Sequence, residues 1–262
     1  MGESRYRNVL EGIVWSYSKL ETYNDCPYKF FLKYIYECTD TTNFYASYGS
    51  FMHKLIEMYY RGFLKKENML SEFLTGFDTI VEGIKPSNNI VCNYIKQGVN
   101  YLRDFTPFDM NVVDIEKKIE FKINKYNFVS IIDFIGEKDG EIYIIDHKSR
   151  NLKKRSGRSK PTVKDKELDN MLKQLYIYSA AIEQQYGVLP DKLCFNCFRT
   201  NTVITERFDI GKYKEATGWA VSVIEDILKT DDFYPQIDYF SCKNICGVSN
   251  NCEYYKMNKE KR

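Results

Sequence analysis

Two acidic residues and a lysine on adjacent apolar segments could hold a divalent metal ion. Asp133 ends the apolar run of the segment FVSIIDFIG, residues 128–136, and Asp146 stands two residues before Lys148 in the next segment, EIYIIDHKS. Residues two apart on a strand point to the same face of a sheet, so Asp146 and Lys148 would project together. Two carboxylates at one place repel each other unless a cation lies between them, and hard oxygen ligands suit Mg²⁺ or Mn²⁺. With a lysine to orient or deprotonate water, this set is suited to metal-assisted hydrolysis of a phosphodiester.

A group of cysteines near the C-terminus is the second candidate site. Three of the eight cysteines lie within eleven residues, as Cys242, Cys246 and Cys252. In a reducing compartment, clustered thiols are more often metal ligands than disulfides, but three ligands leave a tetrahedral site one short. Cys194 and Cys197 also form a C-x-x-C pair. Their odd separation on a strand places them on opposite faces, which favours packing in the core.

A basic segment follows directly after Lys148. From Lys148 to Lys166 there are nine basic side chains and one acidic one, with no apolar periodicity. Lys153, Lys154 and Arg155 lie in its first half. The segment is either a solvated loop or a surface that follows the backbone of a nucleic acid.

Periodicity predicts which elements position these residues. Helices are expected over residues 16–38, with a break at Cys26-Pro27, and over 49–65, 69–83, 90–105, 168–186 and 212–229. Strands are expected over 112–124, 128–136, 141–149, 192–199 and 202–209. This order predicts an α/β fold with a central mixed sheet flanked by helices. We expect one domain over residues 1–262, with a helical part at 16–110, a catalytic sheet core at 111–210 that includes the basic loop 150–170, and a helix with a cysteine-bearing tail at 211–262.

Composition excludes several classes of protein. Of 262 residues, 44% are hydrophobic and 28% are charged, which excludes wholesale disorder and low-complexity chains. The net charge is +2, so any surface for nucleic acid must be local. No apolar run reaches the roughly 18 residues of a membrane helix, and the segment MGESRYRNVLEG lacks the apolar stretch of a secretory signal. We expect a soluble cytoplasmic protein with no membrane partner.

Six short motifs stand in order along nearly the whole chain. They are S-x-L-x-x-Y-x-x-C-P-x-x-F from Ser18 to Phe30, G-x-x-x-H from Gly49 to His53, Ile131-Ile132-Asp133, Ile145-Asp146-His147-Lys148, Q-x-x-x-Y from Gln174 to Tyr178, and the C-terminal cysteines. In this order they resemble the PD-(D/E)XK nuclease superfamily. The resemblance is closest to its RecB-like branch, which includes the AddB nuclease domain and the CRISPR-adaptation iron–sulfur exonucleases. Ser130 stands where the family often has Gly, and Asp146 where Glu is frequent.

The resemblance implies a restriction-endonuclease-like core and further site residues. His53 would join Asp133 and Asp146 as a metal ligand, and His147 would contribute only its backbone carbonyl, because its side chain points away from that of Asp146. Glu57 and Glu120 could assist near the metal or be plain surface carboxylates.

Gln174 and Tyr178 lie four residues apart on one helix face. The resemblance gives them contacts with DNA or with the active site, and a buried amphipathic stripe is the other interpretation.

The resemblance also supplies a fourth cysteine, Cys26. With Cys242, Cys246 and Cys252 it would hold a 4Fe–4S cluster and link the two ends of the chain. Zinc remains the alternative, because four thiolates alone do not distinguish the two centres.

The expected function is that of a Mg²⁺- or Mn²⁺-dependent DNA nuclease in recombination, repair or DNA processing. An exonuclease on single-stranded ends is favoured over a sequence-specific endonuclease, because no recognition module is appended. A helicase or recombination protein could be its partner. The alternative is a catalytically silent or accessory DNA-binding subunit of a larger helicase or recombination assembly, with a zinc centre.

Overall fold

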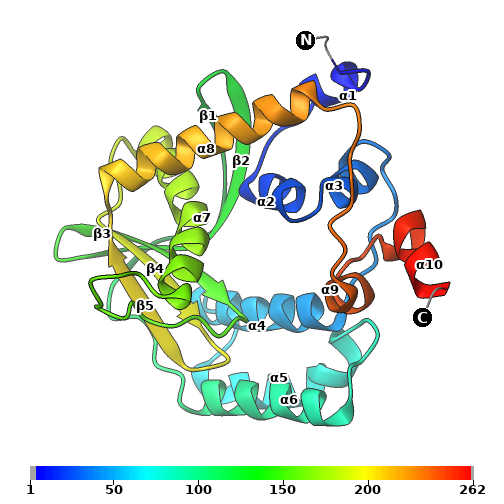
Figure 1. Cartoon of the computed structure of the whole chain (residues 1–262). Coiled ribbons are helices and arrows are strands. Elements are labelled where there is room, and N and C mark those ends of the chain that lie inside the picture. Colours follow the sequence, from blue (N-terminus) through cyan, green and yellow to red (C-terminus); the bar gives the residue numbers. More distant parts are fainter. Residues whose placement is uncertain (1–3, 261–262) are drawn as a thin grey trace.

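The computed structural model describes residues 4–260, with side chains described up to residue 258. Five strands form one sheet in the order β1-β2-β3-β4-β5 (Figure 1). They are β1 Asn111–Ile123, β2 Tyr126–Lys138, β3 Glu141–Lys148, β4 Lys192–Cys197 and β5 Thr202–Arg207. Only β3 and β4 pair in parallel, through the crossover helix α7, and the other neighbours are antiparallel. The predicted mixed sheet is confirmed.

The predicted helices are present in the predicted order, with some boundaries that the sequence periodicity did not give, and the short helices at residues 7–11, 239–244 and 253–260 were not predicted. They are α1 Arg7–Glu11, α2 Tyr17–Asp25, α3 Pro27–Tyr34, α4 Phe44–Tyr60, α5 Lys66–Ile80, α6 Asn88–Arg103, α7 Val163–Tyr186, α8 Ile210–Lys229, α9 Tyr239–Asn244 and α10 Glu253–Glu260. The expected starts at residues 49 and 168 were wrong. The Asn43 side chain caps α4 earlier, and a capping box of Thr162 and Asp165 starts α7 earlier.

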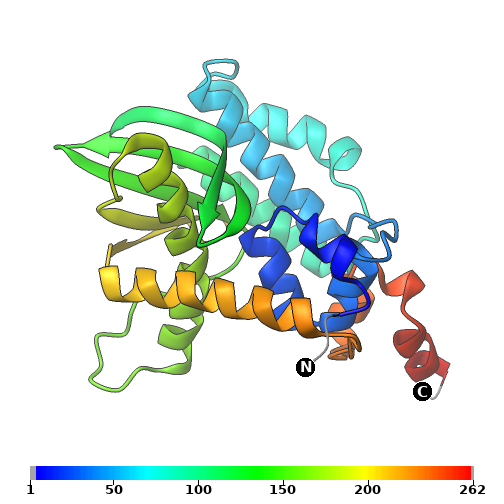
Figure 2. The same cartoon turned by 90° about the horizontal axis from the view of Figure 1, so that it is seen from above.

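Helices cover both faces of the sheet (Figures 1 and 2). On one face α7 and α8 enclose a large core, to which α2 and α3 also contribute. On the other face lies α4, which packs against α5 and α6 in a second core. Cys197 belongs to the large core and Cys194 to a small third one, so the predicted placement of this pair on opposite faces is confirmed.

Strands β2 and β3 separate in the middle of the sheet. They pair only from Lys138 and Glu141 up to Phe134 and Ile145. The alternation of β2 also breaks there, because Ile132 lies in the large core and Phe134 in the small one. Residues two apart on a regular strand would share a face. We call the opening between the two strands the fork.

The C-terminal segment returns to the N-terminal helices (Figure 1). The Ser4 hydroxyl donates to the carbonyl of Thr230 at 2.7 Å, and the Thr41 amide donates to the carbonyl of Gly247 at 2.9 Å. This return brings Cys26 close to the C-terminal cysteines. None of the helices in residues 4–260 is both long enough and apolar enough to cross a membrane.

Candidate active site

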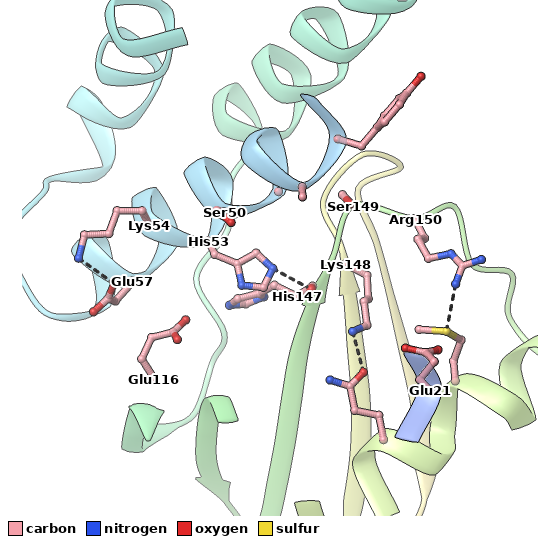
Figure 3. A pocket seen from close by; sticks show the side chains of 15 residues that line it. Glu21, Ser50, His53, Lys54, Glu57, Glu116, His147, Lys148, Ser149 and Arg150 are labelled. Carbon is pink, nitrogen blue, oxygen red and sulfur yellow. Dashed lines mark hydrogen bonds and ion pairs between the residues drawn. The ribbon is translucent and has the colours of Figure 1, made fainter. Parts of the chain in front are cut away.

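An open cleft of about 550 Å³ lies between α4 and the end of β3, beside the fork. Helix α4 turns one face toward its core, through residues such as Tyr48 and Leu55. Its other face presents Gly49, His53 and Glu57, which are four residues apart, to the cleft. Figure 3 shows His53 on one side of the cleft and Lys148 on the other.

Asp146, Lys148, Gln174 and Tyr178 form one hydrogen-bonded group. The Gln174 amide nitrogen donates to Asp146 Oδ1 at 2.8 Å and to the Tyr178 hydroxyl at 2.7 Å. Lys148 Nζ donates to the Gln174 amide oxygen at 2.8 Å and lies 2.7 Å from Asp146 Oδ2. Asp146 and Lys148 therefore project to the same side, as expected, and Gln174 fixes both.

His53 and Asp133 meet at the backbone of His147. The His147 amide donates to Asp133 Oδ2 at 2.6 Å, and His53 Nε2 lies 2.9 Å from the His147 carbonyl. A carbonyl can only accept, so Nε2 carries the proton. Burial lowers the pKa of His53, so the ring is neutral near pH 7 and Nδ1 keeps its lone pair. Nδ1 lies 3.5 Å from Asp133 Oδ2, so two acceptors face each other there.

The His147 ring belongs to the opposite face, as the alternation of the strand predicts. Its Nδ1 accepts a hydrogen bond from Asn196 Nδ2 at 3.0 Å, and the same amide donates to the Tyr101 hydroxyl at 2.8 Å. Burial lowers the pKa of His147 well below its ordinary range. The ring is thus a neutral packing group, and only the backbone of His147 faces the cleft.

Glu116 is a site residue that sequence reasoning missed. Among the described residues, the one group of three or more potential ligands whose atoms lie within 4.8 Å of one another is His53, Glu116 and Asp133. Figure 3 shows the Glu116 carboxylate turned toward His53. Burial and, after it, the charge of Glu57 raise the pKa of Glu116. Its φ of 48° is a left-handed conformation that is unfavourable for glutamate, so local strain accompanies this placement.

The two glutamates considered from the sequence are engaged elsewhere. Glu57 lines the cleft, but its carboxylate binds Lys54 at 2.9 Å and Arg61 at 2.7 Å. Glu120 is exposed and pairs with Lys118. Neither is as free to bind a metal as Glu116.

The donor set suits a hard cation. Asp146 Oδ2 is buried, and no described residue meets it with hydrogen-bond geometry, because the Lys148 contact is a close ion pair in an unfavourable direction. Asp133 is also buried, and burial followed by the charge of Asp146 raises its pKa well above the ordinary range. The close group of ligand atoms is that of His53, Glu116 and Asp133, and Asp146 stands outside it although its charge acts on Asp133. Carboxylates, a neutral imidazole and a carbonyl are ligands that Mg²⁺ or Mn²⁺ accepts, and a cation would remove the repulsion.

We expect Asp133→Asn to stabilise the metal-free protein at neutral pH. The pKa of Asp133 is higher in the folded than in the unfolded state, so folding favours the protonated carboxyl. This contribution to the free energy of unfolding is fully present below the unfolded pKa and is lost as pH rises through the folded pKa. Asparagine cannot ionise, so the variant does not lose this contribution. In EDTA at pH 7 its free energy of unfolding should exceed that of wild type by at least about 1 kcal/mol, and the difference should vanish near pH 4. Urea unfolding at both pH values measures this. A gain of equal size at pH 4 would contradict the electrostatic cause.

The basic loop contributes unequally to the cleft. Arg150 lines the cleft, whereas Lys153 and Lys154 are exposed outside it. Arg155 pairs with Asp169 and Glu206, each at 2.9 Å. Arg155 therefore anchors the loop to α7 and β5, and its charge is already neutralised.

The four cysteines proposed as cluster ligands line one small cavity. Backbone amides reach two of the sulfurs, from Gln236 to Cys26 Sγ and from Tyr255 to Cys252 Sγ, both at 3.4 Å. No three of the four sulfurs lie within 4.8 Å of one another, all four being described residues. The structure thus gathers residues 26, 242, 246 and 252, and keeps the other cysteines out of this cavity.

The fold and the cleft are those of a metal-dependent nuclease. A family model for the PD-(D/E)XK nuclease superfamily matches residues 14–253, so the chain belongs to this superfamily. Among solved structures, a "Putative exonuclease" from Eubacterium rectale is similar, with a TM-score of 0.54 and 12% identity over 97% of this chain and 90% of that chain. At this identity the likeness shows the fold alone. The comparison with curated proteins gave no match.

Proposed function

We propose that this protein is a Mg²⁺- or Mn²⁺-dependent DNA exonuclease of the RecB-like branch, acting on single-stranded ends in DNA recombination, repair or processing. The observation that carries the proposal is the meeting of Asp133, Asp146 and Lys148 at the fork, next to an open cleft. The name of the similar solved structure agrees with an exonuclease.

His53, Glu116, Asp133, Asp146 and the His147 carbonyl would hold the metal. When bound, the ion supplies Lewis acidity toward a phosphoryl oxygen and acidifies a water molecule. With Nε2 directed at the His147 carbonyl, Nδ1 of His53 is the ring nitrogen that faces Asp133 and would bind the ion, and the second lone pair of the carbonyl oxygen stays available to it.

The other side chains act on water and phosphate. Hydrolysis joins the oxygen of water to phosphorus and breaks one ester bond, leaving one phosphate end and one hydroxyl end. Lys148 is placed to orient the water and to balance charge on phosphorus. Gln174 holds Lys148 and Asp146 at fixed positions, with Tyr178 behind it.

A four-cysteine centre would link the chain ends. Tetrahedral zinc, with bonds of about 2.3 Å, needs sulfurs roughly 3.8 Å apart. No three of these sulfurs lie within 4.8 Å of one another, which supports a 4Fe–4S cluster over zinc, and the amides that point at two sulfurs would stabilise thiolates in either centre.

Lys153 and Lys154 would attract the DNA backbone, with Arg155 as an anchor of their loop. We expect the double variant Lys153→Ala/Lys154→Ala to weaken binding of single-stranded DNA and to lower the slope of log affinity against log salt by about 1, because fewer counterions are released. Fluorescence anisotropy at several salt concentrations, in Ca²⁺ to limit cleavage, measures the slope. Lys65→Ala/Lys66→Ala, on the start of α5, is the matched control. If the slope of log affinity against log salt is the same for both double variants, the loop is only a solvated surface.

A time course with DNA labelled at its 5′ or 3′ end, single- or double-stranded and with or without EDTA, tests the proposed activity. Metal-dependent release of short products from one single-stranded end is the expected result. DNA binding without cleavage in either metal would favour the alternative, a silent or accessory subunit of a helicase or recombination assembly.

A further inference from the structure

A second pocket lies behind Gln174, between α2, β1, β2 and α7. Its volume is about 370 Å³, within the range of roughly 300–1,000 Å³ for small-molecule sites. Polar groups from four elements line it: Ser16, Ser18, Lys118, Ser130, Gln174 and Tyr178. The proposed mechanism uses only the last two of these.

The pocket adjoins the proposed catalytic centre. Gln174 lines both the cleft and the pocket, so its side chain separates the two. The same amide donates to Asp146 Oδ1 and to the Tyr178 hydroxyl. One amide therefore holds the proposed metal ligand Asp146 and the pocket residue Tyr178, with the cleft and the pocket both bordering Gln174.

Ser130 provides independent support for a ligand. The residue is 4% exposed, and its buried hydroxyl finds no hydrogen-bond partner among the described residues. An unsatisfied buried hydroxyl lowers stability and is uncommon in folded proteins. Its place in the pocket wall means that a polar ligand there could supply the missing hydrogen bond.

The other walls fit the parts of a nucleotide. Lys118 pairs with Glu120 at an exposed position, with side chains 62% and 72% exposed, so its ammonium can turn to a phosphate. Val129 and Ile131 give the pocket an apolar side, and Ile131 is 52% exposed despite its apolar side chain. A base or sugar can cover such a surface.

We propose that this pocket binds the terminal nucleotide of the DNA strand, on the far side of the scissile phosphate from the cleft. The inference rests on the proposed nuclease function and adds the binding site that would make the enzyme act at an end. Lys118 binds phosphate, and the Ser130 hydroxyl gives or accepts one hydrogen bond.

Binding of thymidine 5′-monophosphate, measured by calorimetry with Mg²⁺ present, tests this site. The monophosphate has no phosphodiester to cleave. We expect it to bind more tightly than thymidine or inorganic phosphate alone, and Lys118→Ala to weaken it roughly tenfold. Ser130→Ala should weaken it severalfold while leaving thermal stability equal or higher, because it removes an unsatisfied hydroxyl. A merely structural serine would not give this combination.

Lys122→Ala is the matched control, since Lys122 lies on the same strand outside the pocket, and it should bind as wild type does. Unchanged affinity in both Lys118→Ala and Ser130→Ala would overturn the site. So would a wild-type protein that degrades DNA but does not bind the monophosphate, and that result leaves the proposed activity standing. If the protein binds the monophosphate through Lys118 but does not cleave DNA, the binding site is supported and the proposed nuclease activity is contradicted.

Discussion

Lys148→Ala is expected to lower the rate of DNA hydrolysis by about 10³-fold while leaving DNA affinity and Mn²⁺ affinity near wild type. Lys148 contacts Asp146 and Gln174 but is not a metal ligand, so its removal acts on water and on charge in the transition state. Single-turnover cleavage of an end-labelled strand gives the rate, and calorimetry with Mn²⁺ gives the metal affinity.

Asp146→Asn distinguishes the proposed role of Asp146 in metal binding from the role of Lys148 in the reaction. It should lose hydrolysis to a similar extent but, unlike Lys148→Ala, should also bind Mn²⁺ more weakly, because a carboxylate ligand is lost. Lys85→Ala, which removes an exposed lysine paired with Asp78, controls for loss of positive charge. Wild-type rates in purified, folded Lys148→Ala would remove Lys148 from the mechanism.

Local sequence pattern predicted the part of the site that depends on regular structure. Asp146 and Lys148 share a face because the alternation of a strand requires it, and Gln174 and Tyr178 share one because of the spacing of a helix. His147 was placed correctly for the same reason. These relations hold whatever the neighbouring elements do, so one sequence suffices to predict them.

The parts that depend on irregular backbone could not be read from the sequence. Regular alternation groups Glu116 with the polar surface residues Lys118 and Glu120 of β1. The pairing of β1 with β2 places Ile115 opposite Phe134 and Lys117 opposite Ile132, so Glu116 stands across from Asp133, and its left-handed backbone accompanies this placement; neither the register nor the backbone conformation is visible in the segment itself. Long-range pairing had the same effect on Arg155, whose partners Asp169 and Glu206 lie on other elements. Charge composition alone did not show that this arginine is neutralised.

Cys26→Ser is expected to remove both the colour and part of the stability of the protein. Anaerobically purified wild type should be brown, with broad absorption near roughly 400 nm and about four irons per chain. Loss of one ligand should bleach the protein and remove the link between residues 26 and 252. We expect a cost of about 2 kcal/mol, or a fall in Tm of about 4–8 °C, because the bonds from Ser4 to Thr230 and from Thr41 to Gly247 still hold the ends together.

Two other cysteines serve as controls for this change. Cys92→Ser, at an exposed position, should keep both colour and Tm, and Cys194→Ser should keep the colour. Stoichiometric zinc in a colourless wild type would refute the iron–sulfur centre and keep the link. Colour that survives Cys26→Ser would mean that another thiol is the fourth ligand, with Cys38 the next candidate. DNA hydrolysis by Cys26→Ser, measured well below its lowered Tm, should stay near the wild-type rate, because the cysteines lie near the chain ends and the acids proposed to bind the metal lie at the fork.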